Sequence, residues 1–321
     1  MAVADKLVSV PKLMAKPKKQ RTLLKDFARD YQLHLIIALP VIWFVIFRYI
    51  PMYGAQIAFR DFLAADGMWG SQWVGLKHFK KFFESYLFWR VVSNTLFLSL
   101  YTVAATFPIP VLLALSINNT MNQPYRKTIQ MVVYAPYFIS TVVMVGMLIQ
   151  FLSPAIGIYG NVMRLFRIEP VGILGKPELF RSVYVWSQVW QFSGFGTIIY
   201  LATLSSIDPE LHQAAIIDGA TRIQRTIHID VPGIMPTVVI ILILTMGQMM
   251  NVGFEKVFLL QNPLNLETSE IIRTYVYKIG LTGIPRFSYA SAIGFFNSVI
   301  NFFLIVAFNF AGKRLAGSSL W

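Results

Sequence analysis

The sequence predicts an all-α polytopic membrane protein with six transmembrane helices. Hydrophobic residues make up 56% of its 321 residues and charged residues only 13%. That composition is too apolar for a soluble domain, and the chain is too long for a single span. Six runs of about twenty mostly apolar residues follow one another, each long enough to cross a bilayer as a helix.

The expected spans lie at about 33–51, 91–117, 128–152, 182–205, 234–260 and 289–311. They form a membrane domain over 33–312, with a basic tail at 1–32 before it and a short tail at 313–321 after it. The first run follows a long tail, carries Arg48 and precedes no small-x-small cleavage site, so we expect a retained anchor and not a signal peptide. Even numbers of spans place both termini on one side. Eight basic residues against three acids in the first tail favour the cytoplasm.

Several classes of function are disfavoured by what the sequence lacks. Cysteine is absent, which excludes disulfides and thiolate metal sites. The four histidines show no ligand spacing, and no G-x-S-x-G nucleophile motif occurs, so we expect no metal and no catalytic residue. The net charge of +13 suits anionic lipid headgroups and does not require nucleic acid. No phosphate-binding loop is present either, so we do not expect this chain to bind ATP by that device. If ATP drives its function, the energy must come from another subunit.

A polar stretch at 208–232 separates the fourth and fifth apolar runs. Asp208 is a good N-cap, Pro209 suits a first helical turn, and Glu210 suits the positive end of a helix. Gly219 can adopt the left-handed conformation that ends a helix. The sequence therefore predicts a short helix with defined ends, whose small central residues let another protein approach its backbone.

This stretch resembles the EAA loop of ABC-importer permeases, on residues Ala214, Ala215, Asp218, Gly219, Ala220, Ile229 and Pro232. The resemblance implies the type I ABC importer permease fold and an ATPase-coupling site made of these residues with Glu210 and Gln213. The family has Glu where this chain has Gln213, and Leu where it has Val231. An exposed ion pair contributes about 0 to 1 kcal/mol, so the loss of charge at Gln213 should weaken one contact without abolishing coupling. The alternative is an ordinary amphipathic loop helix.

The same resemblance implies the partners. They are a second permease subunit that is a different chain, two cytoplasmic ATPase subunits that bind ATP and Mg²⁺, and an extracytoplasmic solute-binding protein. This chain itself would hold no cofactor and would lie in the bacterial cytoplasmic membrane. The outward segments at about 52–90 and 261–288 resemble permeases of complex-oligosaccharide importers, including the alginate importer.

Polar residues inside the expected spans indicate a substrate path, because unpaired polar groups in hydrocarbon are costly and face protein or water. We expect Gln248, Asn251 and Glu255 on one face of the fifth helix, since they are spaced three and then four apart. Further pairs at helical spacing occur in the fourth span, Gln188 and Gln191, and in the sixth, Asn297 and Asn301. The alternative for each is hydrogen bonding between helices.

Charge favours an acidic cargo. The outward parts carry fourteen basic and eight acidic residues, and a positive outer vestibule attracts anions such as uronate saccharides. The alternative is that these bases meet lipid phosphates. A competing function, an ion-coupled secondary transporter or channel, has no use for an ATPase-docking loop. A membrane enzyme would need paired acids or a metal constellation, and Glu255 alone supports neither.

Overall fold

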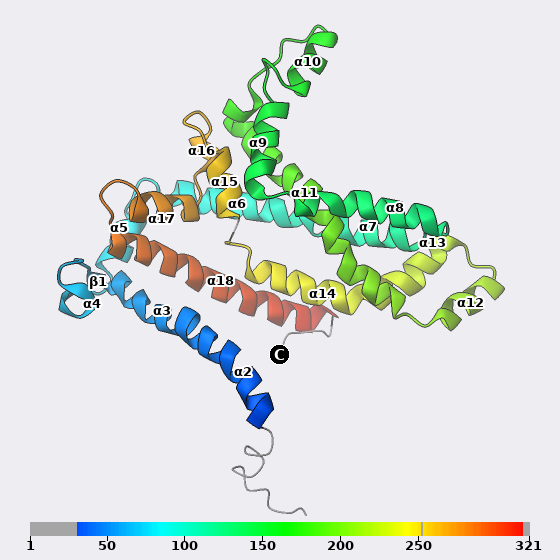
Figure 1. Cartoon of the computed structure of the whole chain (residues 1–321), viewed down its shortest axis with the longest axis horizontal. Coiled ribbons are helices and arrows are strands. Elements are labelled where there is room, and N and C mark those ends of the chain that lie inside the picture. Colours follow the sequence, from blue (N-terminus) through cyan, green and yellow to red (C-terminus); the bar gives the residue numbers. More distant parts are fainter. Residues whose placement is uncertain (1–30, 252, 317–321) are drawn as a thin grey trace, which may run out of the picture. The chain divides into compact units, whose positions relative to one another are not determined.

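The structure, a computed structural model, describes residues 31–251 and 253–316 of the chain (Figure 1). Most of the expected N-terminal tail and residues 317–321 of the C-terminal tail lie outside the described residues. The chain divides into two units, Met1–Gly54 and Ala55–Trp321. In the first unit, α2 (Tyr31–Phe44), η1 (Val45–Tyr49, a π-helical turn) and α3 (Ile50–Met52) form one apolar helix with no buried residue.

Short elements follow before the next long helix. They are η2 (Tyr53–Phe59), β1 (Arg60–Asp61), α4 (Gly67–Gly70), β2 (Gln72–Trp73) and α5 (Lys77–Phe83). The two strands pair antiparallel, with Arg60 opposite Trp73. They are the only strands in the described part of the chain, so the predicted all-α class holds apart from this two-residue ladder.

The remaining elements are helical. They are α6 (Phe88–Thr106), α7 (Pro108–Asn118), α8 (Gln123–Tyr134), η3 (Ala135–Phe138), α9 (Thr141–Phe151), α10 (Ile158–Leu165), η4 (Ile173–Gly175), α11 (Pro177–Ser205), α12 (Pro209–Ile217), α13 (Arg222–Arg225), η5 (Thr226–Asp230), α14 (Val231–Gly247), α15 (Phe254–Leu260), α16 (Leu266–Ser269), α17 (Ile272–Leu281) and α18 (Phe287–Ala316). Within this unit, Figure 1 shows α12 at one end of the long helices and α5 and α17 at the other.

Helix α11 is the centre of the second unit. It packs against α6, α7, α8 and α14. Its first half contributes Tyr184 and Val185 to one apolar cluster, with Val257 of α15, and its second half contributes Tyr200 and Leu204 to another. The helix therefore joins the elements around α15 to the residues on either side of α12.

The number of apolar spans is smaller than the expected six. Among the described residues, four helices are long and apolar enough to cross a membrane, or five if the bent pair of α8–η3 and α9 counts as one span. Helix α11 has 29 residues but is not among them. It carries Ser187, Gln191, Ser193 and Thr197 buried along its length. A helix enclosed by other helices can be this polar, because protein and not lipid surrounds it.

The third expected span, 128–152, is not one straight helix. Its two halves, Gln123–Phe138 and Thr141–Phe151, meet at an angle of 98°. Pro136 lies in the short 3₁₀ turn before the break, and the Ser140 side chain accepts a hydrogen bond from the Val143 backbone N–H at 3.3 Å, which caps the second half. Local cap chemistry therefore starts a new helix where apolarity alone predicts continuity.

The fifth expected span, 234–260, is also interrupted. Helix α14 ends at Gly247 and α15 begins at Phe254, so the prediction that Gln248, Asn251 and Glu255 share one helical face is wrong. Other helices satisfy the interrupted backbone. The Met250 N–H donates to Asn301 Oδ1 at 3.0 Å, and the Gly253 N–H donates to Tyr184 Oη at 3.2 Å. These tertiary bonds replace the helical ones that a continuous span would make.

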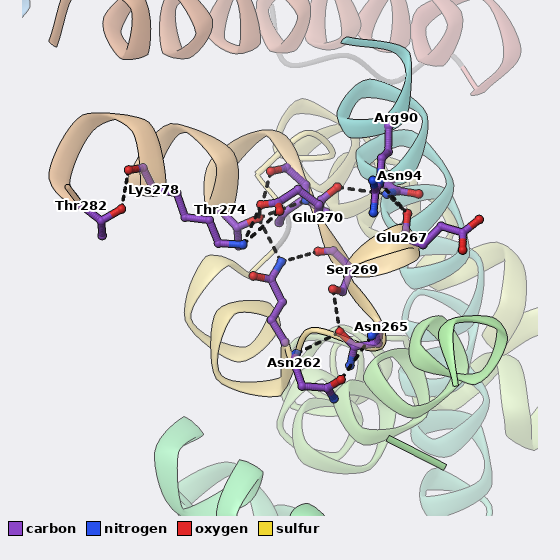
Figure 2. Close-up of polar contacts among 12 residues, drawn as sticks. Arg90, Asn94, Asn262, Asn265, Glu267, Ser269, Glu270, Thr274, Lys278 and Thr282 are labelled. Carbon is purple, nitrogen blue, oxygen red and sulfur yellow. Dashed lines mark hydrogen bonds and ion pairs between the residues drawn. The ribbon is translucent and has the colours of Figure 1, made fainter. Parts of the chain in front are cut away.

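A polar network fixes the segment between α15 and α17 (Figure 2). Asn94 of α6 donates to the backbone oxygens of Glu267 and Glu270 at 2.8 and 3.1 Å. Asn265 is fully buried and donates to Leu260 O at 3.0 Å. Glu270 pairs with Lys278 at 3.0 Å. Helices α16 and α17 are thus bound to α6 and α15 by paired polar groups, which suits a rigid surface.

Candidate coupling segment and polar path

The coupling segment, residues 208–232, contains a helix with both ends capped. The Asp208 carboxylate accepts a hydrogen bond from the Glu210 N–H at 2.9 Å. At the other end Gly219 has φ of +78°. Its N–H donates to Ile216 O at 3.0 Å, and the Ala220 N–H donates to Ala215 O at 2.8 Å. These two bonds form a Schellman motif, so α12 begins and ends where the cap residues predicted.

The coupling segment exposes apolar side chains. Leu211 is 54% exposed, Ile217 is 86% exposed and Ile223 is 73% exposed. Gathered on one short segment, such aliphatic groups indicate a surface that another protein covers. The capped helix ends hold this surface in one shape, which lowers the cost of binding.

The structure places the predicted coupling residues in two groups. Glu210, Gln213, Ala214, Asp218, Gly219 and Pro232 are exposed, while Ala215, Ala220 and Ile229 are partly buried. Five of them, Ala215, Asp218, Gly219, Ala220 and Ile229, line a cavity of about 300 Å³ together with Gln224, Arg225 and His228. Residues from the end of α12 and from the later part of the segment therefore line the same cavity.

The base of the coupling segment is held by the membrane helices. Ile207 and Val231 pack against the apolar cluster of α7, α11 and α14 that includes Ile234. Asn119, at the end of α7, donates from Nδ2 to Thr226 Oγ1 at 2.8 Å. These contacts connect both ends of the coupling segment to α7, α11 and α14.

A contact that the sequence did not indicate joins α12 to the start of α14. His212 Nε2 lies 3.3 Å from Asp230 Oδ1, and Asp230 is only 2% exposed. The pair is close enough for an ion pair when the imidazole is protonated, but it lacks the alignment of a hydrogen bond. Asp230 ends the π-helical turn η5, and such turns are frequent at functional sites. The two residues are eighteen positions apart in the sequence, beyond the reach of helical periodicity.

Replacing His212 by alanine should loosen the coupling segment, because the buried Asp230 carboxylate then loses this contact. Asp230 Oδ1 already has no hydrogen bond, so the loss is that of a neighbouring charge partner and not of a hydrogen bond. We expect faster proteolysis within residues 208–232 of the purified complex. The matched control is Gln213→Ala, one residue along and exposed. Equal cleavage rates in the two variants would show that the contact does not hold α12.

The structure brings four of the predicted path residues together in an amide cluster, Gln248, Asn251, Asn297 and Asn301. Asn251 Nδ2 donates to Gln248 Oε1 at 2.8 Å. Asn251 Oδ1 accepts from Asn297 and Asn301 at 3.3 and 3.2 Å. The residues meet because the chain breaks between α14 and α15, and not because they share a helical face.

The other two path glutamines belong to a separate lysine cluster, Lys256, Gln188 and Gln191. The Lys256 ammonium donates to Gln188 Oε1 and to Gln191 Oε1, each at 3.1 Å. Lys256 is 2% exposed, and no carboxylate lies within 4 Å of it among residues 31–251 and 253–316. The Lys256 amine is therefore held by two amide oxygens, and no acid of the described residues lies against it.

Glu255 lies apart from both clusters. Its side chain is exposed, whereas its neighbour Lys256 points into the protein. Sequence reasoning selected Glu255 and left out Lys256. Lys256 lies three residues after Gly253, within the first turn of the helix that restarts there.

These features define a class: an α-helical membrane transport subunit with a short capped helix that exposes apolar side chains at one end, and with polar groups enclosed between its helices. The family comparison agrees. Residues 107–317 match the family "Binding-protein-dependent transport system inner membrane component". The chain belongs to this family, the type I ABC importer permeases. It is therefore a transport subunit and not an enzyme.

The chain is similar to two proteins of Bacillus subtilis (strain 168) at 37% identity. One is Protein LplB, with 91% of this chain and 92% of the relative covered. The other is the polygalacturonan/rhamnogalacturonan transport system permease protein YteP, with 96% of each covered. A solved bacterial ABC transporter involved in the import of the acidic polysaccharide alginate has a chain that is 39% identical, with a TM-score of 0.85 over 92% of this chain and 99% of that chain.

Proposed function

We propose that this chain is one permease subunit of an ATP-driven, binding-protein-dependent importer of uronate oligosaccharides. A second, different permease chain would complete the pathway across the cytoplasmic membrane. Two ATPase subunits would bind ATP and Mg²⁺, one of them at α12, and a solute-binding protein would deliver the saccharide on the outer side. Both termini would be cytoplasmic, so that the coupling segment faces the ATPase.

The coupling segment carries the proposal. It combines a capped helix, exposed Leu211 and Ile217, and an anchored base within a chain of the permease family. A docking helix of this kind has no function in an ion-coupled carrier, so we do not favour that alternative. ATP-driven closure of the ATPases would move α12 and rock the helices, alternating access to the path between the two faces.

An acidic cargo is supported by charge. The buried Lys256 ammonium has no carboxylate partner within 4 Å in the described part of the chain. One relative, YteP, is named for polygalacturonan and rhamnogalacturonan transport, and the alginate transporter is titled for an acidic polysaccharide. Amide clusters complement such a charge, because sugar hydroxyl groups need donors and acceptors.

ATPase measurements on the purified complex test this proposal. We expect the binding protein loaded with uronate oligosaccharides to stimulate ATP hydrolysis several-fold more than the same protein offered neutral oligosaccharides of equal length. Equal stimulation by both would contradict the acidic cargo. A complex that purifies without an ATPase subunit would contradict the importer itself.

A further inference from the structure

A cavity on the second unit lies between α15, α17 and α18. Its volume is about 380 Å³, within the range of about 300 to 1,000 Å³ that small-molecule sites occupy. Its polar and aromatic lining consists of Asn251, Phe254, Arg273, Tyr277, Asn297 and Ser298. One cation, three other hydrogen-bonding side chains and two aromatic rings thus surround a space large enough for a sugar unit.

One lining residue has an unused acceptor. Asn297 is 7% exposed and donates from Nδ2 to Asn251 Oδ1 at 3.3 Å. Its own Oδ1 is buried and has no hydrogen-bond partner within the described residues. Buried polar atoms are almost always satisfied, and this acceptor becomes available to a ligand when the amide turns toward the cavity that the side chain lines.

Arg273 supplies an unpaired positive charge at the same cavity. Its side chain is exposed, and within the described part of the chain it makes no hydrogen bond or ion pair. The nearest acid in the sequence is Glu270, just before α17, and it already forms an ion pair with Lys278 at 3.0 Å. A guanidinium presents two parallel donors that match a carboxylate, so Arg273 suits a carboxylate ligand better than a neutral one.

The helix that carries Arg273 and Tyr277 is firmly anchored on its other residues (Figure 2). The Ile272 N–H donates to Thr95 Oγ1 at 2.9 Å, and Lys278 Nζ contacts both oxygens of Glu270. Thr274 is fully buried and contacts Glu270 at 3.2 Å. The cavity wall is therefore held in place before any ligand binds, which lowers the entropic cost of binding.

Aromatic rings form the apolar part of the wall. The Phe254 and Tyr277 ring centroids are 5.2 Å apart, and Phe258 meets the Tyr277 ring edge to face at 5.0 Å. Rings packed in this way cannot rotate freely, so they present a fixed apolar surface. The apolar face of a sugar ring packs well on such a surface.

We propose that this cavity is a subsite for one hexuronate unit. Arg273 binds the carboxylate, Asn297 Oδ1 accepts a hydrogen bond from a ring hydroxyl, and Phe254 and Tyr277 cover the apolar side of the ring. The subsite rests on the proposed function, because it assumes that the complex imports uronate oligosaccharides. It adds the point in this chain at which the acid group is recognised.

Uptake by the reconstituted complex, supplied with binding protein and ATP, tests the subsite. Two oligosaccharides of equal length are compared, a uronate and its carboxyl-reduced neutral counterpart. For Arg273→Gln we expect KM for the uronate to rise about tenfold with kcat nearly unchanged, and KM for any neutral uptake to stay as in the wild type. Arg273→Lys should recover part of the loss, because it restores the charge without the paired donors.

Arg286→Gln is the matched control, since Arg286 is also an exposed arginine of the outward side but does not line the cavity. An unchanged uronate KM in Arg273→Gln would overturn the subsite and leave the proposed function intact. An equal loss for both sugars, or the same loss in Arg286→Gln, would also overturn it. A wild-type complex that imports neither sugar would instead contradict the proposed function, and the subsite with it.

Discussion

Replacement of Gly219 by valine should abolish most uptake while the protein still inserts into the membrane. Gly219 has φ of +78°, and a Cβ atom added there would meet no other atom within 4 Å. The cost therefore comes from the backbone alone, and for L-residues the left-handed conformation costs about 1 to 2 kcal/mol, more for a β-branched residue. Opening the turn would change the direction in which the chain leaves α12.

The expected result follows from the proposed role of α12. A reoriented helix would leave the ATPase cleft, so ATP hydrolysis should lose its stimulation by the loaded binding protein. Because about 1.4 kcal/mol corresponds to a factor of ten, we expect uptake to fall on the order of tenfold or more. Radiolabelled uptake and ATPase activity of the same vesicles measure the two effects together.

Two variants separate coupling from general strain. Gly283 has φ of +68° and equally open surroundings, but it lies in the turn between α17 and α18, so Gly283→Val carries a similar backbone penalty far from α12. Gly219→Asn should retain most uptake, since Asn tolerates this conformation. Normal uptake in Gly219→Val, or an equal loss in Gly283→Val, would refute the proposed role of α12 in coupling ATP hydrolysis to uptake.

A cross-link reports the docking directly. The chain contains no cysteine, so Ala215→Cys introduces a single thiol on α12. We expect it to cross-link to an ATPase subunit in the otherwise native chain and to lose that cross-link in the Gly219→Val background. A thiol that never captures a nucleotide-hydrolysing neighbour would count against the whole assignment.

The sequence was most informative where structure is local. Asp208 and Gly219 predicted both ends of α12, because caps depend on hydrogen bonds within a few residues. The pairing of Gln188 with Gln191 was likewise visible from helical spacing. Apolar length also located the described long helices, although it predicted the third and fifth spans as continuous.

The errors lie where distant residues decide the structure. The chain breaks after Gly247 because Tyr184 and Asn301 satisfy the freed backbone groups, and neither partner is visible from the local sequence. The partners of Lys256 lie on α11, more than sixty residues away. The contact of His212 with Asp230 likewise depends on how η5 turns the chain back. Periodicity cannot indicate any of these contacts.

Lys256→Leu should destabilise the protein strongly. The change leaves Gln188 Oε1 and Gln191 Oε1 without their donor, and each buried acceptor that loses its partner costs about 1 to 3 kcal/mol. It also removes the side-chain hydrogen bonds that connect α15 to α11. We expect a clearly lower midpoint in thermal unfolding of the purified complex, whereas Lys127→Leu, at an exposed lysine of α8, should leave that midpoint unchanged.

Replacing all three members of the lysine cluster by leucine distinguishes a structural role from a functional one. A buried polar group that is removed together with its partners is often neutral or stabilising. The triple variant should therefore regain part of the lost stability, less the cost of the bonds from Gln191 to Ile139 O and from Gln188 to Tyr184 Oη that it also removes. Uptake should not return. At an effective dielectric constant of about 20, a charge attracts an anion 8 Å away by about 2 kcal/mol, which corresponds to roughly thirtyfold in binding. If the stable triple variant imported uronate oligosaccharides at the wild-type rate, Lys256 would be a structural residue and the path for the acid groups would lie elsewhere.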